Sequence, residues 1–166
     1  MLIYLIGFMG SGKTVVGKEL KRLTSYPLID MDEEIVRREG RSVNEIFSED
    51  GEEYFRAVET EVLKDLASRD IAIISCGGGV PLKEENRKIM KESGKVFFLY
   101  AEPRDIAARL KRDTTRPLLA EKKDESYIRE MMEKRRSAYE AAADHIIKSD
   151  NITEPKDVAK RIVGLL

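Results

Sequence analysis

Cysteine, tryptophan and glutamine are scarce or missing in this chain. Its 166 residues include one cysteine, Cys76, and neither tryptophan nor glutamine. One cysteine cannot build an internal disulfide framework, so a reducing compartment is the simpler setting. The absence of glutamine beside abundant lysine and glutamate is typical of heat-adapted proteins, and a drift in base composition explains the same bias equally well.

Long apolar runs and an excess of one charge are missing as well. No stretch approaches the roughly 20 apolar residues that a membrane-spanning helix needs. The opening residues 1–9 lack a basic leader and contain Gly7, which favours a buried strand over a signal peptide. The formal net charge of −1 argues against nucleic acid as a main partner, because that partner calls for a strongly basic face. We expect a soluble, cytoplasmic protein that binds neither membrane nor nucleic acid.

Apolar segments of strand length alternate with helical patterns along the whole chain. The expected strands are 2–6, 27–29, 71–75, 96–100 and 145–148. The expected helices are 12–24, 31–39, 42–67, 83–92, 103–112, 124–142 and 155–165. Strands that are apolar throughout predict a parallel sheet covered on both faces, which is an α/β fold. The polar stretch 111–124 is the least regular part, and its length is typical of a lid.

The most specific motif lies between the first strand and the first helix. Residues 7–14 read Gly-Phe-Met-Gly-Ser-Gly-Lys-Thr and match the pattern G-x-x-x-x-G-K-[ST] in full. Glycines carry no Cβ, so the backbone N–H groups can wrap closely around a phosphate. Lys13 would place a charge near the β- and γ-phosphates, and the Thr14 hydroxyl is a natural Mg²⁺ ligand. A glycine-rich turn with an incidental lysine is the alternative, which the strand–helix context disfavours.

Two aspartates and a run of glycines follow later strands. Many P-loop enzymes hold Mg²⁺ with an aspartate at a strand end, but the third strand runs instead into Cys76 and Gly77–Gly79. We therefore assign Asp30 to the magnesium shell, through water, and Asp32 to an acceptor hydroxyl. Capping of the helix at 31–39 is the alternative role for either aspartate, and the two roles can coexist. The glycine run predicts a backbone-lined surface that a substrate approaches closely, although it could simply end the strand.

Arginines occupy positions where apolar residues are expected. Arg135 falls on the inward stripe of its helix, so it must meet an anion, pair with a core carboxylate, or extend past the edge of the stripe. Arg56 lies at the edge of another inward face, beside Phe55. Two guanidinium groups near a glycine-lined wall and an aspartate would suit a hydroxy acid, because a guanidinium matches a carboxylate bidentately. Arg116, in the loop, could cover the γ-phosphate as an arginine finger does, or it could be solvated.

Together these residues resemble the shikimate kinase family over nearly the whole chain. The matching segments, in order, are Gly7–Thr14, Asp30–Asp32, Ile46–Phe47, Gly51–Glu52, Phe55–Arg56, Glu59, Gly77–Gly79, Arg116–Leu119, and Arg135 with Tyr139. Val15 stands where a small hydroxyl residue is frequent in that family.

The resemblance implies a fold and a reaction. The fold is the three-layer αβα P-loop type with five parallel strands in the order 2-3-1-4-5. Residues 1–166 would form one kinase domain, with a substrate-binding region at about 31–60 and a mobile lid at about 111–124. The reaction transfers the γ-phosphoryl group of ATP to the 3-hydroxyl of shikimate, with one Mg²⁺ per active site, in a protein that we expect to be a monomer.

The resemblance also implies residue roles. The catalytic residues would be Lys13, Asp32 and Arg116. The ATP site would comprise Gly10, Ser11, Gly12, Lys13, Thr14, Val15, Arg109, Arg116 and Pro155, with Arg109 and Pro155 beside the adenine. Shikimate would be bound by Asp32, Arg56, Gly77, Gly78, Gly79 and Arg135. Mg²⁺ would be held by Thr14 and by Asp30 through water. Two questions stay open: whether Asp32 only orients the hydroxyl or also accepts its proton, and whether the chain phosphorylates another small hydroxy acid such as gluconate, or binds ATP without catalysis.

Overall fold

The computed structural model describes residues 1–112 and 124–166. The predicted sheet is confirmed: five parallel strands lie in the order β2-β3-β1-β4-β5. The strands are β1 (Leu2–Ile6), β2 (Leu28–Asp30), β3 (Ala72–Ser75), β4 (Lys95–Tyr100) and β5 (His145–Lys148). The central strand β1 is buried along its whole length, whereas the edge strands β2 and β5 are partly exposed. This difference follows from position, since an edge strand has a neighbour on one side only.

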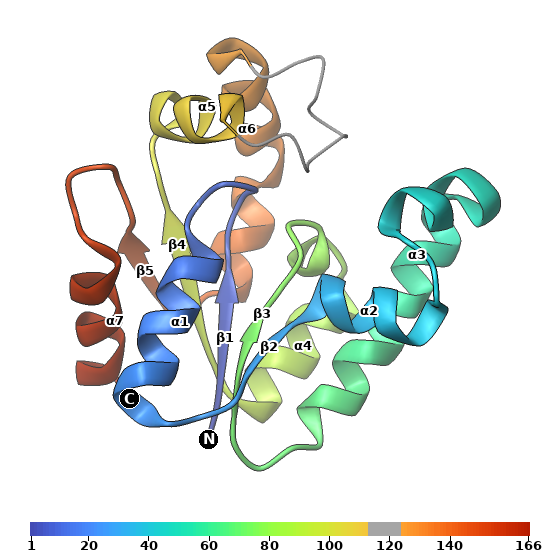
Figure 1. Ribbon diagram of the computed structural model, residues 1–166, viewed down its shortest axis with the longest axis horizontal. Helices are drawn as coiled ribbons and strands as arrows, with labels where there is room; N and C mark the ends of the chain where they lie inside the picture. Colours follow the sequence, from blue (N-terminus) through green and yellow to red (C-terminus); the bar gives the residue numbers. More distant parts are fainter. Residues whose placement is uncertain (113–123) are drawn as a thin grey trace.

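Helices cover both faces of the sheet. The helices are α1 (Lys13–Thr24), α2 (Met31–Glu39), α3 (Val43–Ala67), α4 (Glu84–Ser93), α5 (Pro103–Lys111), α6 (Glu125–Ala142) and α7 (Pro155–Gly164), with a short 3₁₀ helix η1 at Val80–Leu82. Their bounds lie within one residue of the predicted ranges. Figure 1 shows the chain ends at the side of the molecule opposite α5.

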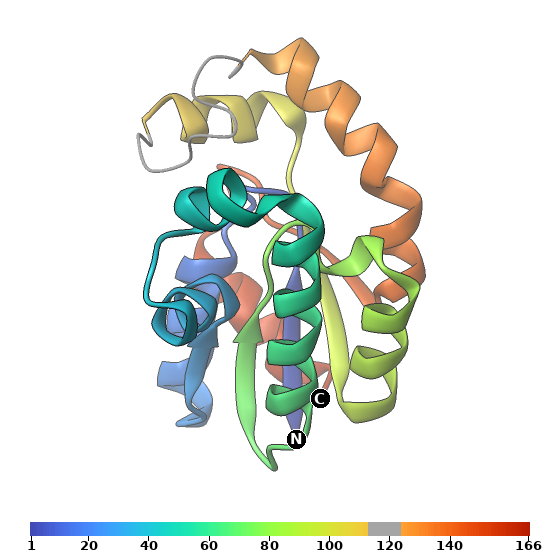
Figure 2. The ribbon, with the colours of Figure 1, turned by 90° about the vertical axis from the view of Figure 1, so that its right-hand side faces the viewer.

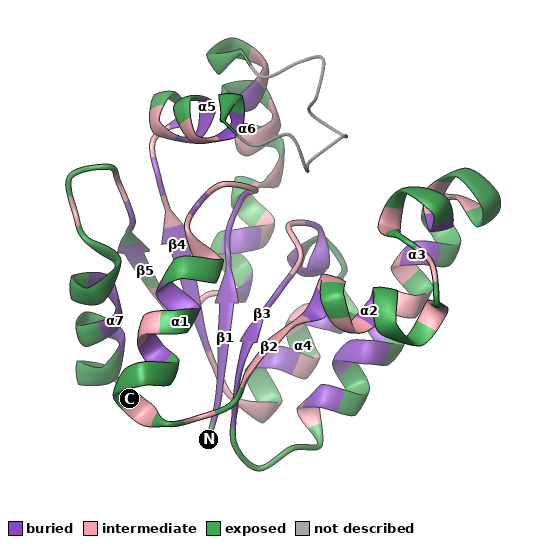
Figure 3. Ribbon diagram, viewed as in Figure 1, coloured by how far each residue is buried: buried purple, intermediate pink, exposed green. Residues whose placement is uncertain are grey.

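Alternate residues of each strand pack into two separate cores. Ile3 and Leu5 of β1 face the core formed with α1 and α7. Leu2, Tyr4 and Ile6 face the larger core formed with α2, α3, α4 and α6. Figure 2 shows α3 and α4 side by side on this second face, with α6 beside α4. In Figure 3 the colour of buried residues runs along β1 and β3 and recurs in separate patches on the helices around the sheet. The result is the predicted three-layer arrangement.

Helix α3 differs from its predicted form because it contains a kink. Its start has a capping box, in which the Ser42 side chain accepts from Glu45 N and the Glu45 side chain accepts from Ser42 N. Gly51 then has φ 85° and ψ 173°, which are not helical values. A glycine adopts this conformation without steric cost, and the kink turns the first part of the helix toward the carboxyl ends of the strands.

Candidate active site

The loop between β1 and α1 is shaped around its glycines. Gly10 and Gly12 have φ values of 78° and 99°, in the left-handed region that favours glycine. The Nζ atom of Lys13 donates to the carbonyl oxygens of Gly7 at 2.7 Å and Phe8 at 3.1 Å. This holds the lysine side chain across the loop, at the N-terminus of α1. Backbone N–H groups at such a terminus form a site for anions.

Arg109 of α5 binds this loop through hydrogen bonds of its guanidinium group. Its guanidinium donates to the carbonyl oxygens of Gly10 and Ser149, both at 2.8 Å, and to Asn151 Oδ1 at 2.9 Å. Burial lowers the pKa of Arg109 below its ordinary value, with Asp105 opposing this effect. The contacts connect the phosphate loop to the segment between β5 and α7. Arg109 therefore has a structural role that the sequence did not indicate, beside the predicted one at the adenine.

The remaining predicted ATP residues differ in position. Ser11 and Val15 belong to the loop and to the first turn of α1, and the Val15 side chain is exposed at the pocket. Pro155 is the exposed first residue of α7 and is not among the residues that line the pocket. Arg116 and most of the predicted lid at 111–124 lie outside the described residues.

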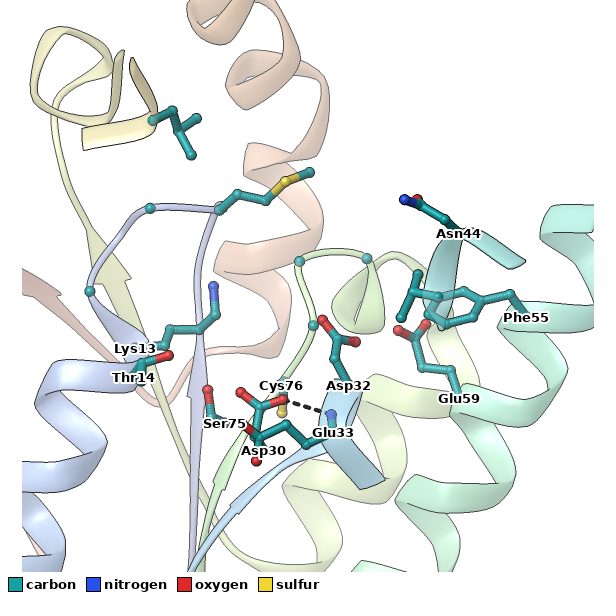
Figure 4. A pocket seen from close by; sticks show the side chains of 18 of the residues that line it. Lys13, Thr14, Asp30, Asp32, Glu33, Asn44, Phe55, Glu59, Ser75 and Cys76 are labelled. Atoms are coloured by element: carbon teal, nitrogen blue, oxygen red, sulfur yellow. Dashed lines mark hydrogen bonds between the residues drawn. The ribbon is translucent and has the colours of Figure 1, made fainter. Parts of the chain in front are cut away.

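Asp30 and Asp32 lie where β2 passes into α2. Asp30 caps α2, since its Oδ1 accepts from Glu33 N at 3.1 Å. The capping alternative therefore holds for Asp30, while Asp32 lies in the first turn of the helix. Figure 4 shows both carboxylates in the same pocket as Lys13 and Thr14, with Asp32 between Lys13 and Glu59. The cap uses only one of the two carboxylate oxygens of Asp30, so the other oxygen can face a ligand.

The three glycines after β3 bring their backbone against charged side chains. A Cβ atom on Gly77 would lie 3.0 Å from Asp32 Oδ1 and 3.2 Å from Glu59 Oε2. One on Gly78 would lie 3.2 Å from Arg135 Nη1, and one on Gly79 would collide with the guanidinium of Arg56. A side chain at any of these positions would have to displace one of these charged groups, so the glycines let the charged side chains lie close to the backbone. The close approach of a substrate to this surface stays a prediction.

Arg135 reaches this wall from α6. Its Cζ atom lies 5.7 Å from the centre of the Phe8 ring, within cation–π distance. Its Nη1 atom is buried and has no hydrogen-bond partner among the described residues. A buried guanidinium nitrogen without a partner is costly, so this atom favours an anion in the pocket. One turn later, the buried Tyr139 donates its hydroxyl to the Gly78 carbonyl oxygen at 2.7 Å and holds the wall in place.

Arg56 pairs with a buried glutamate that the sequence analysis gave no role. Its Nη1 atom lies 3.0 Å from Glu59 Oε1, and the more exposed Glu52 lies 3.5 Å from its Nη2 atom. Glu59 is 1% exposed. Burial raises the pKa of Glu59 to about 7, although Arg56 lowers it and the charge of Asp32 raises it further. The signal was available: Glu59 follows Phe55 by four residues and so lies on the inward face of α3.

These groups line one pocket of about 560 Å³ at the carboxyl ends of the strands. Aromatic side chains of Phe47 and Phe55, with ring centres 4.8 Å apart, form part of its wall. The charged lining residues are Lys13, Arg56, Arg109 and Arg135, and Asp30, Asp32, Glu33 and Glu59. The pocket is thus lined by both positive and negative side chains, which suits a ligand that carries both anionic groups and hydroxyls.

No cluster of three or more His, Cys, Asp or Glu side chains in residues 1–112 and 124–166 could hold a metal ion by itself. Over the same ranges, no helix is long and apolar enough to cross a membrane.

Comparisons with known proteins agree on one family. The family model described as "Shikimate kinase" matches residues 9–166. A shikimate kinase of Bacillus anthracis is 44% identical over 144 residues, which cover 87% of this chain and 86% of that protein. A bifunctional shikimate kinase/3-dehydroquinate synthase of Thermotoga maritima is 50% identical over 139 residues, 84% of this chain. The match covers only 27% of that longer relative.

Solved structures give the same result. The structure of shikimate kinase from Acinetobacter baumannii in complex with shikimate superposes with a TM-score of 0.92. It is 36% identical to this chain, and the superposition covers 99% of this chain and 91% of that one. At this similarity the two chains share one fold.

Proposed function

The chain belongs to the shikimate kinase family, a family of transferases that phosphorylate shikimate with ATP, and from this premise we propose how its residues divide the reaction. One observation carries the proposal: the phosphate loop and the arginine-flanked glycine wall open into the same pocket. An enzyme that joins a triphosphate to an organic acid needs both sites side by side. The product is shikimate 3-phosphate, formed at the 3-hydroxyl, with ADP as the second product.

The acceptor carboxylate binds between Arg56 and Arg135. The partnerless Nη1 atom of Arg135 supports this, because a carboxylate would supply the missing acceptor. Gly77, Gly78 and Gly79 form the wall against which the ring lies. Asp32, close to Gly77, accepts a hydrogen bond from the hydroxyl that is phosphorylated.

The donor triphosphate binds in the loop. The N–H groups of Gly10, Ser11 and Gly12 surround the β-phosphate, and Lys13 moves from the loop carbonyls to the β- and γ-phosphates. Val15, Arg109 and Pro155 border the nucleoside, and Arg116 covers the phosphates. The hydrogen bond from Arg109 to the Gly10 carbonyl oxygen supports a position of this arginine beside the loop.

The donor set also fits one Mg²⁺ ion. Thr14 supplies a hydroxyl and Asp30 a carboxylate in the same pocket, and Mg²⁺ is usually bound by one or two such groups together with water and phosphate oxygens. When bound, the ion neutralises charge on the phosphates.

Catalysis rests on positioning and on charge stabilisation. Lys13 and Arg116 stabilise the negative charge of the phosphoryl group during in-line transfer. Asp32 orients the hydroxyl toward that group, and its carboxylate could also accept the proton of the hydroxyl. The domain comprises residues 1–166, with the acceptor region at about 31–60 and a lid at about 111–124. It works as a monomer in the cytoplasm, without nucleic acid or membrane.

The test is a coupled ADP-release assay with a panel of acceptors. Purified protein is mixed with ATP and Mg²⁺, and then with shikimate, quinate, gluconate or AMP. We expect ADP release that depends on shikimate and is at least tenfold faster than with any other acceptor, by analogy with sites built to bind particular hydroxyls. Faster turnover of gluconate would identify another hydroxy-acid kinase. ATP binding without turnover of any acceptor would indicate a module that is not catalytic.

A further inference from the structure

A row of polar side chains connects two segments that flank the part of the pocket formed by Arg56, Gly77–Gly79 and Arg135, here called the acid pocket. Each segment contributes the residue that follows a pocket residue. Thr60 follows Glu59 on α3, and Val80 follows Gly79 at the start of η1. Thr60 Oγ1 lies 2.9 Å from Asn86 Oδ1, and Asn86 Nδ2 donates to the Val80 carbonyl oxygen at 3.0 Å. Thr60 and Asn86 are 3% and 1% exposed. The two segments that flank the pocket are therefore joined by a buried polar connection.

Chemistry fixes the direction of every bond in this row. A carbonyl oxygen only accepts, so the amide nitrogen of Asn86 must face Val80 and its oxygen must face Thr60. The Thr60 hydroxyl therefore donates to Asn86. Its single proton is then not given to the Arg56 carbonyl oxygen, which lies 3.1 Å away. Lys83 Nζ, which can only donate, completes the row from outside at 3.1 Å from Thr60 Oγ1.

The row begins at the Lys83 ammonium, passes through Thr60 and Asn86, and ends at the Val80 carbonyl oxygen. Its order strengthens each hydrogen bond in it. A charged donor polarises the hydroxyl that accepts from it, and bonds in a chain of this kind reinforce one another in a buried setting. Removing one member would leave its buried neighbours without partners. The separation between α3 and η1 is therefore held more rigidly than apolar packing alone would hold it.

This separation matters for the acid pocket. Arg56 lies one turn before Thr60 on α3, and its guanidinium lies directly against the backbone of Gly79. We propose that Thr60 and Asn86 are positioning residues that set the spacing of α3 and the glycine wall, and so seat Arg56 for the acceptor carboxylate. The inference rests on the proposed function, since it assumes that Arg56 binds the acceptor. Thr60 and Asn86 do not line the pocket and act through the groups that do.

The test is the isosteric variant Thr60→Val, with kinetic constants measured for both substrates. We expect the shikimate KM to rise about tenfold, because displacement of a binding group by a fraction of an ångström weakens acceptor binding, while the ATP KM stays within about twofold. Thr60→Ser keeps the hydroxyl, and we expect it to restore the shikimate KM to within about twofold of wild type.

A matched control separates positioning from stability. Asn86 and Ser93 both lie on α4. Tyr4→Phe removes the part-buried hydrogen bond between the tyrosine hydroxyl of β1 and Ser93 Oγ, which measures 2.6 Å. Ser93 lies at the end of α4 remote from the wall, so the shikimate KM of Tyr4→Phe should equal that of wild type even where its melting temperature falls as far as that of Thr60→Val.

A second variant covers the case in which Thr60→Val does not fold. Lys83 is about half exposed, so Lys83→Met is tolerated by the fold, and we expect it to raise the shikimate KM about threefold by removing the charged donor. A wild-type shikimate KM in whichever of these two variants folds would overturn the inference. Absence of shikimate turnover by the wild-type chain would overturn the proposed function itself, which is a different result.

Discussion

Glu59 should make the folded protein less stable as the pH rises from 5 to 8. Its pKa is about 7 in the folded state, against an ordinary value of 4.5, and the main cause is burial. Between these two values the folded protein holds a proton that the unfolded chain has released. The stabilisation is therefore complete below pH 4.5, declines as the pH rises toward 7, and stays level above it.

The size of the effect follows from the shift. One pKa unit corresponds to about 1.4 kcal/mol, so the full shift is worth about 3 kcal/mol, of which roughly 2–3 kcal/mol falls between pH 5 and pH 8. Little discount for solvent is needed, because Glu59 is 1% exposed. The isosteric variant Glu59→Gln cannot titrate, and its amide oxygen can still accept from Arg56. We expect the unfolding free energy of this variant to lack the decrease between pH 5 and pH 8 that Glu59 causes in wild type.

The assay is urea denaturation of both proteins at pH 5, 6, 7 and 8. The quantity of interest is the difference between the two unfolding free energies at each pH, in which other titrating groups cancel. The control is Glu61→Gln on the same helix, whose side chain is 72% exposed, and we expect it to follow wild type. Parallel curves for wild type and Glu59→Gln would refute the reasoning, because Glu59 would then titrate alike in the folded and unfolded states.

Three further predictions concern the pocket. Arg135→Ala should raise the shikimate KM about 10- to 100-fold with little change in the ATP KM, since a charge-assisted hydrogen bond contributes about 1.5–3 kcal/mol; an unchanged shikimate KM would contradict the carboxylate assignment. Lys13→Met should lower kcat at least about 100-fold while circular dichroism and melting temperature stay close to wild type; near-normal kcat would remove the lysine from phosphoryl transfer. Chelation of divalent metal with EDTA should abolish turnover, and added Mg²⁺ should restore it; turnover that persists in EDTA would contradict the site at Thr14 and Asp30.

The sequence predicted the architecture because its signals were local. Each strand is a short apolar run and each helix has its own periodicity, so the strand order, once the P-loop pattern was recognised, followed from the resemblance. The kink at Gly51 escaped notice because one glycine does not interrupt the apolar stripe on either side of it. The kink arises from the positive φ of Gly51, and the spacing of apolar residues does not predict the φ of a glycine.

The sequence predicted many of the residues that line the pocket, but fewer of the contacts that hold them in place. Asp32, Arg56, Gly77–Gly79 and Arg135 line one pocket, as the sequence suggested. The hydrogen bond from Tyr139 to Gly78 joins two distant parts of the chain and depends on a tertiary contact. Arg56 and Glu59, by contrast, lie three residues apart on α3 and pair locally. The spacing of Arg56 and Glu59 on one helix already predicted that they could pair. The burial of Glu59, which raises its pKa, could not be predicted because it depends on how α3 packs in the fold.

A crystal structure of the protein with ADP, Mg²⁺ and shikimate would show whether the phosphate loop and the two arginines bind their ligands in one pocket. We predict the β-phosphate in the loop 7–14, the shikimate carboxylate between the guanidinium groups of Arg56 and Arg135, and the 3-hydroxyl within hydrogen-bond distance of Asp32. A carboxylate bound elsewhere, or a hydroxyl other than the 3-hydroxyl facing Asp32, would contradict the account.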